Sequence, residues 1–104
     1  MPRAERRIDF DGINRAALAN ARDILRRWLP DGRVEGHEYV ARNPRRADRR
    51  HGSFKVNLWS GKWGDFATGD CGGDLVSLAA YLAGVGQGEA ARQLAGMLGI
   101  PCHG

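Results

Sequence analysis

In residues 52–78, GSFKVNLWSGKWGDFATGDCGGDLVSL, the apolar side chains first recur at every second residue and then at helical spacing. A glycine-rich turn, here called the corner, separates the two patterns. Phe54, Val56 and Leu58 alternate with polar residues, which is typical of a strand with one buried face. Residues 60–61, a serine and a glycine, predict a two-residue hairpin turn, and KWGDFA supplies the returning strand. The segment therefore predicts an antiparallel hairpin that leads directly into a helix.

Helical periods lie on both sides of this hairpin. Before it, apolar residues at helical spacing predict one long helix with Asp11 as its N-cap and Pro30 as its stop. After it, a second helix is predicted to start at the N-cap Asp74 and to end at Gly84, and a third lies in residues 87–99. The chain thus has helices at both ends and strands between them.

The segment GRVEGHEYVARN alternates imperfectly and is predicted to form one further strand. The predicted class is α+β, with a small three-stranded antiparallel sheet, one N-terminal helix and two C-terminal helices. The 104 residues are enough for one domain with a modest core. Within this domain we expect an N-terminal helix in residues 1–32, a β-meander in 33–72, a helical pair in 73–100 and a tail in 101–104.

The charge of the chain is distributed unevenly. Residues 1–55 contain 14 of the 16 lysine and arginine residues but 8 of the 12 acidic residues. The first half is therefore strongly basic, and the second half is slightly acidic. Such asymmetry favours an anionic partner, of which nucleic acid is the commonest, followed by an anionic membrane surface or an acidic protein.

The cysteine content indicates a reducing compartment, and the apolar runs match neither a signal peptide nor a membrane span. Only Cys71 and Cys102 are present, too few for the disulfide framework of a small secreted domain. The segment MPRAERRIDF is charged and lacks the apolar core of a signal peptide. The longest apolar stretch, LVSLAAYLAGVG, is shorter than a membrane span of about 20 residues. We expect a cytoplasmic protein without a membrane partner.

The glycine-rich corner fits neither a phosphate-binding loop nor a catalytic site. It lacks a Lys-Ser/Thr pair at the helix start and places Asp70 and Asp74 where a phosphate needs positive charge. Asp65, Asp70 and Asp74 offer the oxygen ligands of a magnesium site, but aspartates around a turn more commonly cap a helix or accept loop amides. The three histidines have no evident catalytic partner. We therefore expect a non-catalytic module.

The order of these elements resembles a known family. The run GSFKVNLWSGKWGDFATGDCGGDLVSLAAYLAG, followed by QGEAARQLAGMLGI, is similar to the zinc-ribbon domain at the front of bacterial and phage DNA primases. That domain has a Cys-Pro-x-His motif, a Ser-Phe-x-Val strand and hairpin, Cys-x-x-Cys, a Gly-Asp step, a hydrophobic helix and a closing helix. The resemblance covers residues 38–100 and is closest to the N-terminal segment of phage- and plasmid-type primase-helicase proteins.

The resemblance implies four zinc-ligand positions, and this chain has no cysteine or histidine at any of them. They fall on Asn43, Arg46, Asp65 and Thr68. Because zinc requires four soft or borderline ligands in a tetrahedron, we expect neither zinc nor another cofactor. A shifted site would have to recruit Cys71 with His51, or the C-terminal Cys102 and His103, without any paired spacing.

In place of a metal, we expect packing and hydrogen bonding to hold the corner. Phe54, Trp63 and Phe66 are the aromatic residues predicted to fill the space. The Asp65 side chain is predicted to hydrogen-bond across the positions that correspond to the metal ligands.

In the family that the chain resembles, this domain contacts the single-stranded template, and a separate domain carries out polymerisation. The resemblance therefore implies binding of single-stranded DNA or RNA. The composition agrees, since arginines neutralise phosphates and exposed aromatics stack on bases. The predicted contact residues are Arg42, Arg45, Arg46, Arg49, Arg50, Lys55, Trp59 and Lys62.

Two other hypotheses stay open at this stage. The first is a metal-free protein-interaction module that docks onto a helicase or a primase polymerase domain. Its contacts would be the small residues of the C-terminal helices, namely Ala79, Ala80, Ala83, Ala90, Ala91 and Ala95. The second is a redox or metal protein that uses Cys71, which metal analysis of the untagged protein would test.

Overall fold

The computed structural model describes residues 7–45 and 53–103, and this part of the chain contains four helices and five strands. They are α1 (Phe10–Ala19), α2 (Ala21–Trp28), β1 (Arg33–Glu35), β2 (Glu38–Ala41), β3 (Phe54–Asn57), β4 (Trp63–Asp65), β5 (Cys71–Gly72), α3 (Leu75–Ala83) and α4 (Gln87–Leu98). The strands form one antiparallel sheet in the order β1-β2-β3-β4-β5. The α+β class is confirmed, whereas the prediction of three strands and three helices is wrong.

The two additional strands lie at the edges of the sheet. The segment predicted as a single strand is a hairpin of β1 and β2, whose turn contains Gly36 with a φ of 64°. This left-handed conformation suits glycine, and it explains why the alternation in the sequence is imperfect. At the opposite edge, β5 pairs with β4 through two residues only, which is too short for an alternating pattern to be recognised.

The turn between β3 and β4 is longer than the predicted two residues. The backbone N–H of Asn57 donates to the carbonyl of Lys62, which leaves residues 58–61 in the loop. The side-chain oxygen of Asn57 accepts from the N–H groups of Trp59 and Ser60 at 2.8 and 2.9 Å. This local hydrogen bonding, typical of asparagine in turns, fixes the longer loop.

The predicted N-terminal helix is two helices separated at Asn20. The Asn20 side chain donates to the carbonyl of Ala16 at 2.8 Å, a local bond that competes with helix continuation. The N-cap of α1 is Asp9 rather than Asp11, and its carboxylate accepts from the N–H of Gly12 at 3.0 Å. The break allows the apolar residues of both short helices to face the same core.

The predicted helix ends on the C-terminal side are confirmed. Asp74 caps α3 and forms a capping box with Ser77, and the carboxylate accepts from the Ser77 N–H at 2.8 Å. Gly84 and Gly99 end α3 and α4 in the left-handed conformation. The C-terminal segment returns to the start of the fold, because Ile8 and His103 form an antiparallel bridge.

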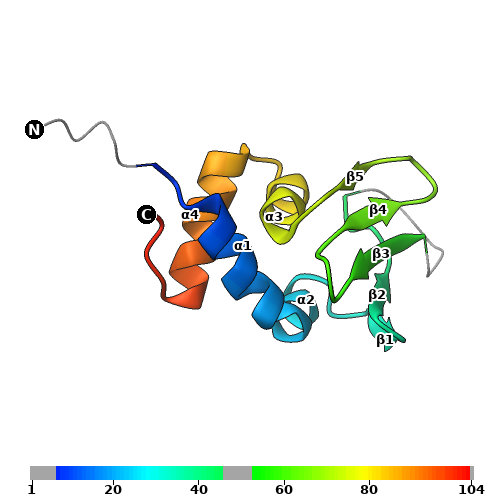
Figure 1. Ribbon diagram of the computed structural model, residues 1–104. Coiled ribbons are helices and arrows are strands. Elements are labelled where there is room, and N and C mark those ends of the chain that lie inside the picture. Colours follow the sequence, from blue (N-terminus) through cyan, green and yellow to red (C-terminus); the bar gives the residue numbers. More distant parts are fainter. Residues whose placement is uncertain (1–6, 46–52, 104) are drawn as a thin grey trace, which may run out of the picture.

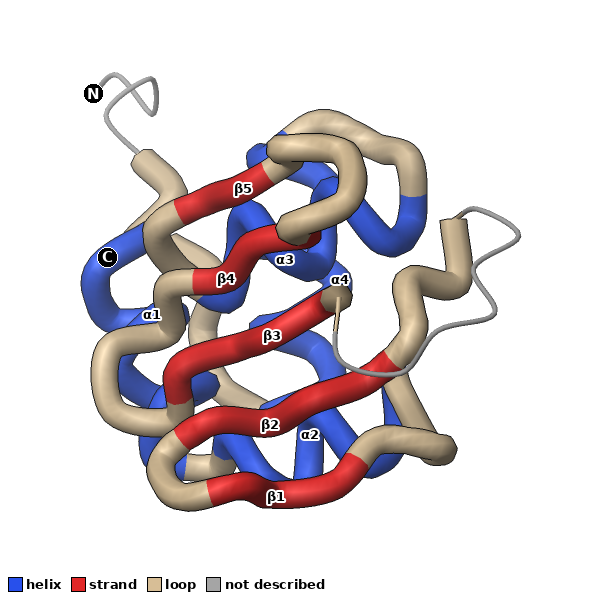
Figure 2. The backbone as a smooth tube through the Cα atoms, turned by 90° about the vertical axis from the view of Figure 1, so that its right-hand side faces the viewer, coloured by secondary structure: helices blue, strands red, loops and turns tan. Residues whose placement is uncertain are grey.

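The sheet and the helices form two layers. Figure 1 shows the helices on one side of the sheet, and Figure 2 shows the strands from the other side, with the helices behind them. Tyr39, Val56 and Trp63 project from the sheet into a core shared with Ile24 of α2 and Leu78 of α3. The other side of the sheet is not covered by any described helix (Figure 2). None of the helices in the described ranges is long and apolar enough to cross a membrane.

Candidate nucleic-acid interface

The strand register decides which side chains point away from the helices. Phe54 and Val56 of β3 are buried in the core, so Lys55 and Asn57 point to the opposite side. Directly paired residues on neighbouring strands share a side of the sheet. We call the side away from the helices the open face; its residues are Arg33, Glu35, Glu38, Val40, Lys55, Asn57, Lys62, Gly64, Phe66 and Cys71, of which Val40 is buried.

The charges of the open face are partly paired. Arg33 forms an ion pair with Glu35, and Lys55 lies 3.9 Å from the carboxylate of Glu38. Lys62 is exposed and forms no ion pair with any residue in the described ranges. Exposed ion pairs are weak and are screened by salt, so they can exchange partners with a phosphate at little cost.

An exposed phenylalanine lies beside Lys55. The Lys55 ammonium group is 5.5 Å from the centre of the Phe66 ring, and Phe66 is 75% exposed. The prediction that Phe66 fills the core is wrong, because Asp65 takes the inward position at the end of β4 and the next residue therefore points outward. Phe54 and Trp63 are buried as predicted.

Trp59 lies in the β3–β4 loop, near the same end of the sheet as Lys62. It is 75% exposed, and its ring stacks on that of His37 with 4.5 Å between centroids and 23° between planes. His37 lies in the β1–β2 turn, so the two loops support one another. The indole is thus held in place while much of its surface is available for stacking.

The described arginines of the predicted loop lie at the opposite end of β3 from Trp59. Arg42 follows β2 and is exposed, next to the start of β3. Arg45 is bound to α3: a guanidinium N–H donates to the carbonyl of Tyr81 at 3.0 Å, and the guanidinium carbon lies 5.2 Å from the Tyr81 ring centre. The other three predicted contacts, Arg46, Arg49 and Arg50, lie outside the described residues, as does His51.

Two of the four positions at which the resemblance to primase zinc ribbons would place zinc ligands are joined by a buried hydrogen bond. The amide of Asn43 donates to the carboxylate of Asp65 at 2.8 Å, and each residue is 1% exposed. The Asn43 side-chain oxygen accepts from the Arg45 N–H, and the second Asp65 oxygen accepts from the Ala67 N–H. The predicted hydrogen bond from Asp65 across these positions is therefore confirmed, and it connects the end of β2 to β4.

Tyr81 of α3 extends this network and was not identified from the sequence. Its hydroxyl accepts from the Asn43 amide at 2.7 Å and donates to the carboxylate of Asp70 at 2.9 Å. Burial raises the pKa of the Tyr81 phenol; the hydrogen bond from Asn43 opposes this rise, and Asp70 adds to it. The only indication in the sequence was a polar-tipped aromatic residue inside an otherwise apolar helix.

The remaining candidate metal ligands are separated in the fold. Thr68 is exposed, and its hydroxyl accepts from the Asp70 N–H. Cys71 lies on β5, whereas the carbonyl of Cys102 accepts from the Asp9 N–H at the start of α1. Within the described ranges, no group of three or more His, Cys, Asp and Glu residues is arranged to hold a metal ion. Arg46, the fourth family position, lies outside these ranges.

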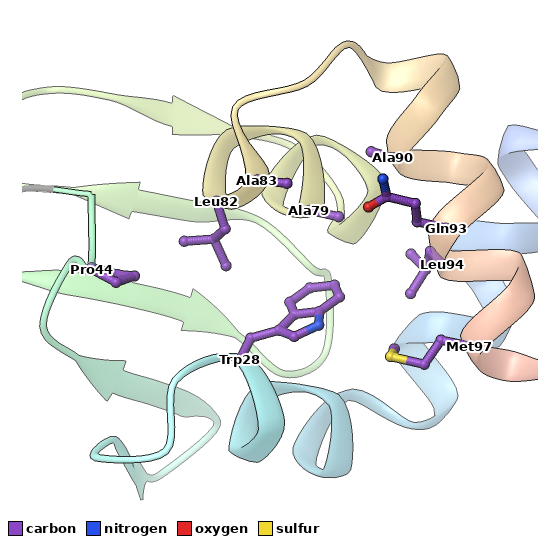
Figure 3. Close-up of a pocket in the computed structure, with 9 residues that line it drawn as sticks. All are labelled: Trp28, Pro44, Ala79, Leu82, Ala83, Ala90, Gln93, Leu94 and Met97. Carbon is purple, nitrogen blue, oxygen red and sulfur yellow. The ribbon is translucent and has the colours of Figure 1, made fainter.

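The alanines proposed for protein docking are mostly part of the core. Ala80, Ala90, Ala91 and Ala95 are buried. Ala79 and Ala83 instead line an apolar pocket of about 430 Å³ between the C-terminal helices and α2. Figure 3 shows Trp28 extending from α2 into this pocket, between Leu82 of α3 and Met97 of α4. The other residues that line the pocket are Pro44, Ala90, Gln93 and Leu94.

Comparison with known proteins adds no relative to this description. No protein-family model and no curated protein matches the chain. The function must therefore be argued from the chemistry of the open face and from the side chains that hold it in place.

Proposed function

We propose that this chain is a non-catalytic module that binds single-stranded nucleic acid across the open face of its sheet. The observation that carries the proposal is an exposed aromatic ring, Phe66, beside the basic residues Lys55 and Lys62 on a face that no described helix covers. A second exposed ring, Trp59, lies in the loop at the Lys62 end of the sheet, beside residues of α1 and α2. Aromatic rings stack on bases of any sequence, and basic side chains neutralise the phosphates.

The positions of these residues suit an extended nucleic-acid strand rather than a compact ligand. Trp59 lies beyond one end of β3, Lys55 lies within it, and Arg42 lies beside its other end. A four-residue β-strand such as β3 is about 13 Å long. The side chains along it therefore offer contacts to several nucleotides. Recognition of this kind depends on stacking and charge and carries little sequence preference.

The resemblance to primase zinc ribbons suggests the biological setting. By this analogy the module acts in the cytoplasm as an accessory domain of a primase or primase-helicase in phage or plasmid replication, with the chemistry performed elsewhere. The hydrogen bond between Asn43 and Asp65 would replace the metal as the link between the first and second ligand positions. Neither zinc nor another cofactor is needed in this account.

Fluorescence anisotropy of a labelled oligothymidylate tests the proposal. Binding with a dissociation constant in the micromolar range or below at low salt, which weakens as salt is added, would support it. The same measurement with duplex DNA and with single-stranded RNA distinguishes the form of nucleic acid. Absence of binding to both single-stranded DNA and single-stranded RNA at about 100 μM protein, the lower limit of ordinary non-specific affinity, would refute it.

The apolar pocket beside Trp28 favours a second candidate function, the docking of a helicase or a primase polymerase domain. Apolar pockets with a large aromatic residue are common anchor sites for partner side chains. Ala83 is exposed at the rim, so Ala83→Phe would occupy the pocket without disturbing the core.

A pull-down with a purified replicative helicase or polymerase domain tests this candidate. Loss of the complex on Ala83→Phe, with no effect of Lys62→Ala, would support docking through the pocket. A complex that survives Ala83→Phe would argue against it.

A further inference from the structure

Gly64 lies on the open face of β4, next to the edge strand β5, and has a residue with a side chain on each of its four sides. Along β4 its neighbours on this face are Lys62 and Phe66. Across the sheet it pairs with Lys55 of β3 and with Cys71 of β5. Figure 2 shows β4 between these two strands. These four residues supply two ammonium groups, an exposed aromatic ring and a thiol, whereas Gly64 between them has no side chain.

The described structure gives no internal reason for a glycine at this position. Gly64 is not among the residues with positive φ, and the strand pairing continues through it on both sides without a bulge. A Cβ atom added to it would lie 3.6 Å from the Cβ of Cys71 and 3.7 Å from the carbonyl oxygen of Asp70, which are ordinary contacts. Gly72 differs, since a Cβ there would lie 2.5 Å from the indole nitrogen of Trp63.

A glycine inside a strand lowers stability, because it has more conformational freedom to lose and no side chain to pack. Where packing permits a larger residue, a glycine points to another molecule that approaches the backbone closely. The residues around Gly64 indicate the chemistry of that molecule. Lys55 and Lys62 attract an anion, and Phe66 offers a surface for a planar base.

We propose that single-stranded DNA crosses the sheet directly over Gly64, with the sugar and base of one nucleotide in van der Waals contact with the backbone there. Lys62 lies on one side of this nucleotide to neutralise a phosphate, and Phe66 lies on the other to stack on a base. The inference rests on the proposed function and names the point at which the strand comes closest to the protein.

Substitution of Gly64 should raise the stability of the fold and lower the affinity for DNA. Gly64→Ala and Gly64→Val are expected to raise the melting temperature by about 2–6 °C, because both residues favour a strand more than glycine does. The dissociation constant for a labelled oligothymidylate of about 15 nucleotides should rise at least about fivefold for valine, which is the low end of the effect of losing one stacked base.

Gly96→Ala is the matched control. Gly96 lies in α4, behind the sheet, where an added Cβ would meet nothing within 4 Å. This variant should also be more stable, because alanine favours a helix more than glycine does, but its dissociation constant should equal that of the unchanged protein.

Alkylation of the two cysteines locates the bound strand independently. Cys71 is exposed beside Gly64, whereas Cys102 is half-buried on the side of α1. Saturating oligothymidylate should slow the reaction of Cys71 with a maleimide, because a strand over Gly64 covers the neighbouring thiol, and should leave the reaction of Cys102 unchanged.

The possible outcomes separate this inference from the proposed function. If the unchanged protein binds DNA but Gly64→Val binds equally well, or Cys71 is not protected, the path over Gly64 is wrong while the function stands. Protection of Cys71 by single-stranded RNA but not by DNA would overturn the assignment of DNA. If the unchanged protein binds neither oligothymidylate nor single-stranded RNA, both the function and the path are refuted.

Discussion

The side-chain amide of Asn43 donates a 2.8 Å hydrogen bond to the carboxylate of Asp65, although the two residues lie 22 positions apart and are both buried. Tyr81 of α3 accepts a second hydrogen bond from the same amide. Three segments are thereby joined: the end of β2, the strand β4 and the helix α3. This network holds the sheet against the helical layer at the end of β3 where Arg42 also lies.

Replacement of Asn43 by alanine should therefore lower the stability of the whole domain. The change removes the amide that donates to Asp65 and Tyr81, and loss of one partner from a buried hydrogen-bonded group lowers the free energy of unfolding by about 1–3 kcal/mol. Urea denaturation would measure the change. Thr68→Ala, at an exposed position, is the control and should lie within about 0.5 kcal/mol of the unchanged protein. Equal stability of Asn43→Ala and Thr68→Ala would contradict a structural role for the network.

Stability should also fall at alkaline pH. Burial raises the pKa of both Tyr39 and Tyr81 above the ordinary value of 10.0. The folded protein therefore retains phenol protons at a pH at which the unfolded chain has released them, so the free energy of unfolding decreases as the pH rises above about 10. Urea titrations at several pH values would detect this decrease. Tyr39→Phe and Tyr81→Phe should each make it shallower; an unchanged slope in both variants would show that other groups cause it.

Trp59 provides a test of stacking that is separate from folding. Because the residue is 75% exposed, Trp59→Ala should lower the free energy of unfolding only by the loss of stacking on His37, about 0.5–1.5 kcal/mol. The affinity for oligothymidylate should fall by about 1–3 kcal/mol. Trp59→Phe, which keeps an aromatic surface, should retain most of the affinity. Anisotropy titrations of the three proteins measure the difference. Should Trp59→Ala bind as tightly as the unchanged protein, this indole does not contact the bases.

Lys62 should contribute through charge rather than through shape. Removing one phosphate contact reduces the slope of log affinity against log salt by about 0.7 for a single strand. We therefore expect Lys62→Ala to weaken binding at low salt and to give a shallower slope. Arg27→Ala is a suitable control, because Arg27 is exposed on α2 in the helical layer. A parallel loss in both variants would indicate a diffuse charge effect.

The features that sequence patterns predicted correctly are local ones. The alternation of Phe54 and Val56 with polar residues indicates a strand with one buried face. Asp74 and Gly84 mark the two ends of α3, because the Asp74 side chain caps the first turn and Gly84 adopts the left-handed conformation that ends the helix. Trp63 was predicted to pack because it is a large aromatic residue, and it is buried. Such signals require no knowledge of the tertiary structure.

The features that the sequence did not reveal depend on contacts that leave no periodic pattern in the sequence. The pairing of β5 depends on its neighbour β4, and the break at Asn20 depends on a side-chain bond that a helical apolar period does not exclude. Tyr81 meets Asn43 across 38 positions. The outward position of Phe66 follows from the burial of Asp65 before it. Burial of this carboxylate is favourable because it accepts a hydrogen bond from Asn43, 22 positions away, and one from the neighbouring Ala67 N–H.

The most direct test of the central claim is the affinity of the unchanged protein for a labelled oligothymidylate, measured by anisotropy over a range of salt concentrations. We predict a dissociation constant in the micromolar range or below at low salt, and a steady weakening as salt increases, because basic residues on the open face replace counterions on the strand. Absence of binding at low salt, or an affinity that salt does not change, would contradict the account.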